Sequence, residues 1–133
     1  MKYLCLGYYD EKKFESLPAA ELAAIPAKCR PLDEALQQSG HVVAVGSLAA
    51  TRDSVSLRPR DGKTVVMDGP YAETKEQLGS FFILEAEDLD EAIRLASMHP
   101  AAQLNEHLGW GIELRPIEAF NTDKFECRLD KNR

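Results

Sequence analysis

Apolar and alternating stretches divide the chain into six expected strands. The first, residues 2–9, carries apolar side chains on both faces, with Leu4 and Leu6 on one and Tyr3 and Cys5 on the other. A strand that is apolar on both faces should lie in the middle of a sheet that is covered on both sides. The remaining strands are expected at residues 41–48, 54–58, 63–67, 78–85 and 111–117.

The clearest local signal is a hairpin in the middle of the chain. Residues 54–58 alternate between polar and apolar side chains, and Asp61-Gly62 then leads into the apolar run 63–67. An Asp-Gly pair between two such runs is typical of a tight turn with positive φ angles. The sequence therefore predicts a β-hairpin here.

A long helical region should follow the first strand. Ala, Leu and Glu are frequent from about residue 18 to residue 38, and Ser16 is the expected N-cap. Pro26 and Pro31 fall inside the region, and proline removes a backbone donor from a helix. We therefore expect a kink or two shorter helices.

A second helix is expected over residues 88–98. Its apolar side chains recur at i, i+3, i+4 and i+7, and Asp88 with Glu91 forms an Asp version of the capping box. The first helical region, in contrast, should end at Ser39-Gly40, because glycine accepts the left-handed conformation that often follows a helix.

This order of elements predicts an α+β fold. Strand–helix–strand, a hairpin and a second strand–helix–strand give a ferredoxin-like split βαβ arrangement with an inserted β-hairpin and an antiparallel sheet. Both helices would cover one face of the sheet, which leaves the face with Leu4 and Leu6 bare. We therefore expect a homodimer formed through the sheet face.

Composition and charge narrow the class of protein. The chain has 133 residues, of which 44% are hydrophobic and 29% charged, as in an ordinary globular domain. Its net charge of −6 and the lack of a basic stripe argue against binding to nucleic acid. No apolar run approaches the length of a membrane span, and no signal peptide is recognisable. We expect a cytoplasmic protein.

Cysteine and histidine give no sign of a metal or cofactor. Cys5, Cys29 and Cys127 are scattered and form no Cys-x-x-Cys pair, so we interpret them as buried or incidental thiols. The three histidines are likewise too isolated for a set of metal ligands. No metal and no cofactor is therefore predicted.

The stretch after the hairpin is the expected site region. Asp68, Gly69, Pro70 and Tyr71 form a turn between two strands, and charged side chains that include Lys75 follow. Conformationally specified loops that connect strands often carry binding residues. Gly69, Pro70, Tyr71 and Lys75 are therefore candidate ligand-binding residues.

The same stretch resembles a known family. Asp68-Gly69-Pro70-Tyr71-Ala72-Glu73-Thr74-Lys75-Glu76, followed by Leu78-Gly79, is similar to the signature of the DGPF-domain branch of the YCII-related family, with Tyr71 in place of the usual Phe. The resemblance covers residues 1–119 and leaves a polar C-terminal tail, residues 120–133. It implies a dimeric α+β barrel. The family consists mostly of uncharacterised bacterial proteins, some of which occur beside or fused to alternative sigma factors.

The chain departs from the wider family at the residues proposed for catalysis. The wider YCII group is thought to use a His near the first helix and an Asp in an Asp-Pro-Phe turn after the second. Here no histidine precedes Gly40, and the second turn reads His99-Pro100. The family's dyad cannot be carried over to this sequence.

In place of the family's His–Asp dyad, Asp68 and His99 are the candidate catalytic residues. A strand-end carboxylate can act as a general base when burial raises its pKa, and a histidine at a helix C-terminus should favour the protonated form. The alternatives are structural: Asp68 caps its turn, and His99 caps a helix or lies on the surface. The hypothesis is that both face one cavity.

Three further residues are candidates for ligand contact. Glu113 and Arg115 lie two apart on the last strand and so share a face, where Arg115 could bind a carboxylate in a bidentate manner. Ion pairs with Lys75 or Glu76 are the structural alternative. Tyr8 is expected to be a cavity wall or core residue.

The functional expectation has two branches. In the first, the protein binds, and in an acid–base reaction transforms, a small polar or aromatic metabolite in a cavity between sheet and helices. In the alternative, it is a non-enzymatic accessory or ligand-sensing module associated with a sigma factor or another transcription regulator. Whether the protein is an enzyme stays open at this point.

Overall fold

The computed structural model describes residues 1–122, and its centre is a four-stranded antiparallel sheet. The sheet has the order β2-β5-β1-β6. Its strands are β1 (Lys2–Tyr9), β2 (Val42–Ser47), β5 (Gln77–Glu85) and β6 (Gly111–Pro116). The predicted α+β fold with a ferredoxin-like split βαβ order is therefore confirmed, and β1 is central as expected. The predicted tail lies outside the described residues beyond position 122.

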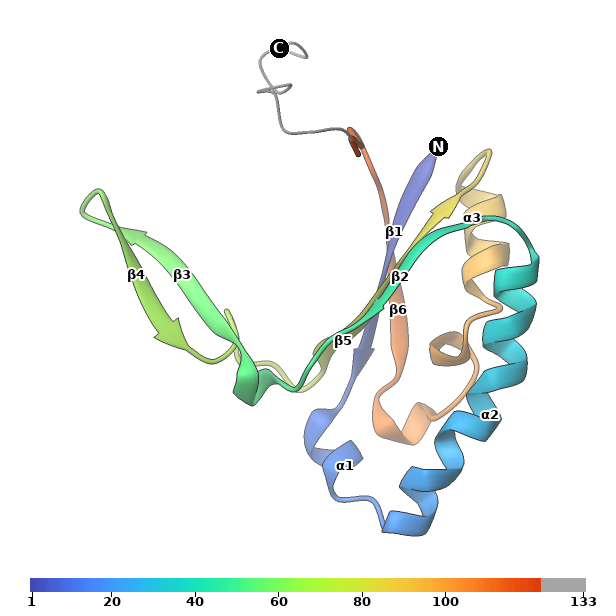
Figure 1. Ribbon diagram of the computed structural model, residues 1–133, viewed down its shortest axis with the longest axis horizontal. Coiled ribbons are helices and arrows are strands. Elements are labelled where there is room, and N and C mark those ends of the chain that lie inside the picture. Colours follow the sequence, from blue (N-terminus) through green and yellow to red (C-terminus); the bar gives the residue numbers. More distant parts are fainter. Residues whose placement is uncertain (123–133) are drawn as a thin grey trace.

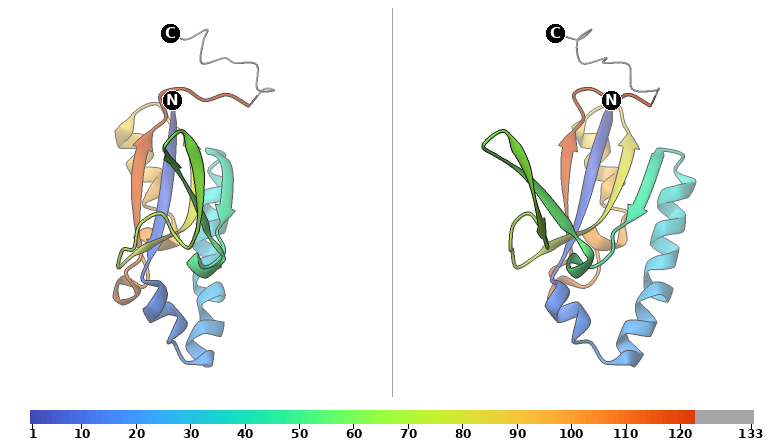
Figure 2. Two further views of the ribbon diagram at one scale, coloured as in Figure 1. Left: turned by 90° about the vertical axis from the view of Figure 1, so that its left-hand side faces the viewer. Right: turned by 60° about the vertical axis from the view of Figure 1, so that its left-hand side comes forward.

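Helices cover one face of this sheet. The α-helices are α1 (Glu11–Glu15), α2 (Ala19–Gln38) and α3 (Leu89–Ala96), and short 3₁₀ turns occur at η1 (Thr51–Asp53), η2 (Pro100–Ala102) and η3 (Glu106–Leu108). Figures 1 and 2 show α2 and α3 on the same side of the sheet. Within the described part of the chain, no helix is long and apolar enough to cross a membrane.

The first helical region differs from the prediction. Pro26 and Pro31 both lie inside one helix, α2, and Ser16 is the C-cap of α1, a helix that the sequence analysis did not predict. Most of α2 is exposed, so water can bond the carbonyl groups that each proline leaves without a helical partner. The proline pattern therefore did not divide the helix.

The second helix begins as predicted. The Asp88 carboxylate accepts a hydrogen bond from the Glu91 backbone N–H at 2.9 Å. The Glu91 carboxylate in turn accepts from the backbone N–H of Glu87 at 3.2 Å, one residue earlier than in a standard capping box. These bonds satisfy backbone donors at the start of α3.

The core lies between the sheet and the helices. Tyr3, Cys5, Phe82 and Leu84 point from β1 and β5 toward the helices and are almost fully buried, together with Leu95 of α3. On the opposite face, the alternate strand residues are only half-buried in the single chain: Leu4, Leu6, Phe81 and Ile83. We call this the open sheet face. Its apolar character matches the expectation for the bare face.

The predicted hairpin forms and stands apart from the main sheet. Strands β3 (Val55–Arg60) and β4 (Lys63–Asp68) pair only with each other. Asp61 and Gly62 join them with φ angles of 51° and 77°, the left-handed conformation that such a turn requires. Figures 1 and 2 show the hairpin projecting on the side opposite α2 and α3, in front of the open sheet face.

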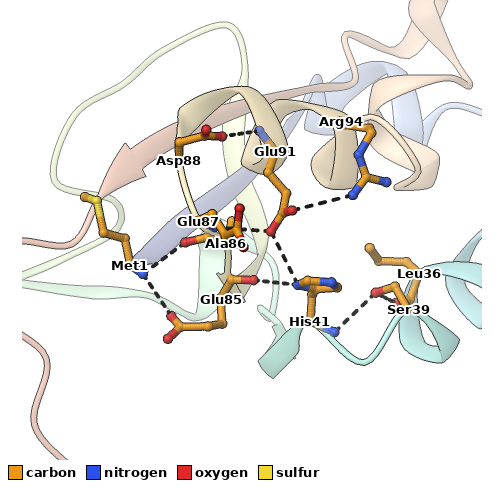
Figure 3. Close-up of polar contacts among 10 residues, drawn as sticks. All are labelled: Met1, Leu36, Ser39, His41, Glu85, Ala86, Glu87, Asp88, Glu91 and Arg94. Carbon is orange, nitrogen blue, oxygen red and sulfur yellow. Dashed lines mark hydrogen bonds and ion pairs between the residues drawn. The ribbon is translucent and has the colours of Figure 1, made fainter.

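A polar cluster ties together the ends of three elements at the edge of the core (Figure 3). The His41 Nδ1 lies 2.8 Å from the Glu85 carbonyl oxygen and 3.8 Å from the Glu91 carboxylate. The Met1 ammonium donates to the Ala86 carbonyl at 2.9 Å. The cluster fixes the C-terminal end of β5 against the start of β2 and against α3.

Candidate functional site

The described part of the chain contains a cavity of ≈ 590 Å³ between the sheet and the helices. Residues of β1, β2 and β5 line one side, and residues of α1, α2 and the segment 99–101 line the other. The ring-bearing residues along it are Tyr8, Tyr9, Phe14, Phe82, His99 and Trp110, and Phe81 also lines it although its side chain lies on the open sheet face. Volume and lining are typical of a small-molecule site.

The aromatic wall is held in place by specific contacts. The Tyr9 and Phe14 rings meet edge to face, with 5.5 Å between centroids and 89° between planes. Gly79 makes this position of Tyr9 possible, because a Cβ atom at residue 79 would lie 2.7 Å from the Tyr9 ring. Any larger residue at position 79 would displace Tyr9 from the cavity wall.

Three hydrogen bonds to the Glu11 carboxylate connect Tyr9 of the cavity wall to the base of the hairpin. The Tyr9 hydroxyl donates to the Glu11 carboxylate at 3.1 Å, and Thr51 donates to the same carboxylate from its backbone N–H at 3.0 Å and from its hydroxyl at 2.6 Å. Burial, and then the hydrogen bond to Glu11, raise the pKa of Tyr9 to about 12. The Thr51 bonds lower the pKa of Glu11.

His99 contributes a fixed polar group to the cavity. It is the N-cap of η2, and its Nδ1 accepts a hydrogen bond from the Ala101 backbone N–H at 3.0 Å. Its ring stacks on Phe82, with 4.6 Å between centroids and 9° between planes. Because Nδ1 is an acceptor, the neutral ring carries its proton on Nε2. His99 therefore acts as a hydrogen-bond donor through Nε2.

The protonation of His99 differs from the expectation. Burial lowers the pKa of His99, and the nearby Asp33 carboxylate opposes this only in part. A second proton would also require Nδ1 to give up the bond from Ala101. This direction is opposite to the one expected for a histidine at a helix end, because burial disfavours the charged ring.

Asp33 is a cavity residue that the sequence analysis missed. It is exposed and lines the cavity together with Cys29 and Leu36 of the same helix. Its carboxylate also adds to burial in raising the pKa of the Cys29 thiol. The spacing of residues 29, 33 and 36 places the three on one face of α2, a signal that could have identified Asp33.

Asp68 does not share this cavity within one chain. It ends β4 in the projecting hairpin, whereas His99 lies behind the main sheet beside α2. The hypothesis that both residues face one cavity therefore needs correction for the single chain. The reason is that β3 and β4 form a separate sheet, which carries the strand end at Asp68 away from the core.

The other predicted loop residues also lie outside the cavity. Gly69, Pro70, Tyr71 and Lys75 follow β4 and are absent from the residues that line the hollow. The loop is instead bound to the hairpin. The Ser56 hydroxyl donates to the Gly69 carbonyl at 2.8 Å.

A cation–π contact holds the next part of this loop. The Arg58 guanidinium donates to the Tyr71 carbonyl at 2.9 Å and lies 4.0 Å from the centroid of the Tyr71 ring. The loop residues therefore contact the hairpin and not the cavity.

The three remaining candidates lie on β1 and β6. Tyr8 is among the residues that line the cavity. Glu113 and Arg115 pair with Leu6 and Leu4 in the register of β1 and β6, so they lie on the open sheet face. There they form an ion pair with each other, and not with Lys75 or Glu76. Arg115 is therefore not positioned to bind a carboxylate in the cavity.

Metal ligands are not grouped in the described residues 1–122. No set of three or more His, Cys, Asp or Glu side chains in this part of the chain is arranged to hold an ion. The polar residues that line the cavity include Asp33, Gln37, Ser47, Ser80 and His99, and Trp110 adds an indole N–H.

Fold and cavity together define a small α+β protein with a ligand-sized hollow behind an antiparallel sheet. Comparison with known families agrees with this class. A family model described as the YCII-related domain matches residues 1–121. The chain therefore belongs to the YCII-related family.

Two individual proteins are similar to the chain. An uncharacterized protein of Rhizobium meliloti (strain 1021) is 32% identical over 120 residues, which are 90% of this chain and 94% of that protein. Among solved structures, the 5-chloro-2-hydroxyhydroquinone dehydrochlorinase of Burkholderia phenoliruptrix AC1100, in complex with 2,5-dihydroxybenzoquinone, is 17% identical with a TM-score of 0.47. It covers 89% of this chain and 94% of its own. We infer no function from this distant likeness.

Proposed function

We propose that this protein binds a small, mainly apolar molecule in the cavity between the sheet and α2. The observation that carries the proposal is the cavity of ≈ 590 Å³ with its aromatic wall and few polar groups. Small-molecule sites combine these properties: apolar surface supplies affinity, and a small number of fixed polar groups orients the ligand.

In this proposal His99 is the residue that orients the ligand. Its ring cannot rotate freely, because Ala101 holds Nδ1 and Phe82 covers one face. The Nε2–H group is therefore a donor of defined direction for an oxygen or nitrogen acceptor on the ligand. If a proton is transferred in the cavity, Asp33 would accept it and His99 would donate a hydrogen bond. Asp68 could take part there only if a second chain supplied it.

Trp110 provides a direct test of binding. It is the single tryptophan of the chain and lines the cavity, so its fluorescence should respond to an occupant. Titration with 4-methylphenol should give a saturable change. Cys29→Phe, which places a ring in the cavity, should abolish the change, and the matched control Cys29→Ser should retain it.

The fluorescence result can contradict the proposal in two ways. A fluorescence change that persists in a folded Cys29→Phe variant would place the ligand elsewhere. The absence of saturation with 4-methylphenol and with a wider panel of small aromatic compounds would refute binding in this cavity. Thermal unfolding of each variant distinguishes loss of binding from loss of the fold.

We further propose that two copies associate through the open sheet face. Leu4, Leu6, Phe81 and Ile83 leave this face apolar, and the hairpin stands in front of it with Leu57 exposed. A second copy would cover both surfaces at once.

Light scattering after size exclusion should accordingly give a dimer. Ile83→Glu should give a monomer, and Leu22→Glu on the exposed part of α2 should leave the dimer intact. A wild-type monomer at micromolar concentration would refute association through this face.

A ligand-sensing or accessory role is the second candidate. The exposed apolar side chains of the hairpin, Val55, Leu57 and Val66, are the observation that favours a protein partner such as a transcription regulator. In that role a bound ligand is recovered unchanged. NMR of the ligand after prolonged incubation with the protein therefore separates sensing from catalysis.

A further inference from the structure

The cavity has an unusual balance of charge. Among the described residues 1–122, Asp33 is the only lining residue with a formal charge at neutral pH, because no lysine or arginine of this part of the chain lines the hollow and His99 is held in its neutral form by the bond from Ala101. A ligand that enters this cavity therefore meets one carboxylate and no cation among the lining side chains.

Arginines close to the cavity-forming elements do not line the hollow. Arg30, next to Cys29 in α2, is exposed and is not among the lining residues. Arg52 pairs with Glu15 at 2.8 Å, and Arg115 pairs with Glu113 on the open sheet face. The net charge of the chain, −6, adds a field of the same sign as Asp33. An anionic ligand would thus be repelled both locally and by the molecule as a whole.

The aromatic wall suits a positive charge as well as an apolar body. Tyr9, Phe14 and Trp110 line the cavity, and aromatic faces attract ammonium groups through their quadrupoles. Asp33 is exposed at the α2 side of the same hollow, where its carboxylate can meet a cation that remains partly solvated.

We infer that the cavity selects a small organic cation, an amine with a short aromatic or aliphatic body. The ammonium group lies against the Asp33 carboxylate, and the apolar body lies among the aromatic side chains. This inference rests on the proposed function, because it assigns a ligand class to the same site. It replaces the expectation of a carboxylate ligand, for which the cavity wall provides no counter-ion.

The expected preference is moderate. An exposed ion pair contributes up to about 1 kcal/mol, which corresponds to about a fivefold change in affinity. A cation should therefore bind about fivefold more tightly than its uncharged analogue, and an anion should bind more weakly than that analogue by a similar factor.

Three compounds with the same phenol ring test the inference. Tyramine, 4-methylphenol and 4-hydroxyphenylacetate carry a positive charge, no charge and a negative charge at pH 7.5. Calorimetry, together with the Trp110 fluorescence titration, should rank them in that order for the wild-type protein. High salt should reduce the differences, because it screens exposed charges.

Asp33→Asn provides the decisive variant, and Glu34→Gln, which removes an exposed charge that does not line the cavity, is its matched control. Asp33→Asn should abolish the preference for tyramine over 4-methylphenol, so that the two compounds bind with equal affinity. Glu34→Gln should retain the wild-type order.

The outcomes separate this inference from the proposed function. Binding of all three compounds without the expected order, or an order that survives in Asp33→Asn, overturns the cation inference and leaves the binding cavity standing. If none of the three binds, and Cys29→Phe changes nothing, the proposed binding function fails as well.

Discussion

The main sheet with its helices and the β3–β4 hairpin are built by different interactions. We call the main sheet with its helices the body. In the body, Tyr3, Leu84 and Leu95 are almost fully buried between layers that come from distant parts of the sequence. In the hairpin, Leu57 and Val66 face each other across the strands and remain 60% and 64% exposed. The body is held by tertiary packing, and the hairpin by its turn and its own backbone pairing.

This difference separates the family signature from the candidate chemistry. The stretch that resembles the family most closely begins at Asp68, and its first residues contact the hairpin through Ser56 and Arg58. The cavity, with His99 and Asp33, belongs to the body. A distinctive motif therefore does not by itself mark the binding site of the single chain, because local sequence can specify the shape of a loop as readily as its chemistry.

Matched truncations in the two regions should give the largest contrast. Leu84→Ala removes a fully buried side chain and should lower the free energy of unfolding by about 2–5 kcal/mol. In the monomeric Ile83→Glu background, where no second copy covers the hairpin, Leu57→Ala removes an exposed side chain and should change the free energy of unfolding by no more than about 0.5 kcal/mol. Urea denaturation of both variants measures the difference.

A larger effect of Leu57→Ala is expected in the wild-type background, where the proposed second copy covers the hairpin. A loss of well over about 1 kcal/mol in Leu57→Ala would exceed the range for an exposed side chain. It would show that the hairpin is covered in solution. Concentration dependence of the urea midpoint would then identify a second copy of the chain as the cover.

The buried imidazole in the body should make stability depend on pH. Burial lowers the pKa of His99 in the folded state, so the unfolded chain binds this proton more readily as the pH falls through the ordinary value of 6.5. Stability is therefore fully present above that value, is lost as the pH falls below it, and levels off below the folded pKa. His99→Gln should reduce the slope of unfolding free energy against pH in this range by the equivalent of at most one bound proton.

His107 supplies the control for that measurement. It is exposed, and His107→Gln should leave the pH dependence as in the wild type. The free energy of unfolding measured between pH 8 and pH 5 tests both variants. Equal slopes for the wild type and His99→Gln would contradict a lowered pKa at His99.

The hydrogen bonds between Thr51 and Glu11, which connect the body to the hairpin, should give the smallest energetic effect. Thr51 donates two hydrogen bonds to the Glu11 carboxylate, but Glu11 is only partly buried, so water can compete for them. A double-mutant cycle with Glu11→Gln and Thr51→Val should give a coupling energy below about 1 kcal/mol.

The Tyr9 hydroxyl sharpens this test. Glu11→Gln should also lower the pKa of Tyr9 from about 12, because a neutral amide no longer favours the protonated phenol. Ultraviolet titration of Glu11→Gln beside a Tyr9→Phe reference measures the change. An unchanged Tyr9 titration together with zero coupling would show that hairpin and cavity wall are not joined through Glu11.

Local and periodic features of the sequence were sufficient to predict most of the strands and helices. The alternation in β1 placed Tyr3 and Cys5 toward the core, the Asp61-Gly62 pair fixed the hairpin turn, and Asp88 marked the start of α3. Each of these depends on neighbours within a few residues, so each can be recognised without the rest of the chain. The strand and helix order that they define was enough to predict the fold.

Only the tertiary structure decided which side chains share the cavity. Asp33 joins His99 because α2 packs beside the segment that follows α3, and Asp68 stays away because the hairpin leaves the main sheet. The charge state of His99 was decided in the same way, since its burial and the bond from Ala101 exist only in the folded chain. Contacts between residues far apart in sequence, and the solvent exposure that results from them, depend on packing between elements, which no local pattern encodes.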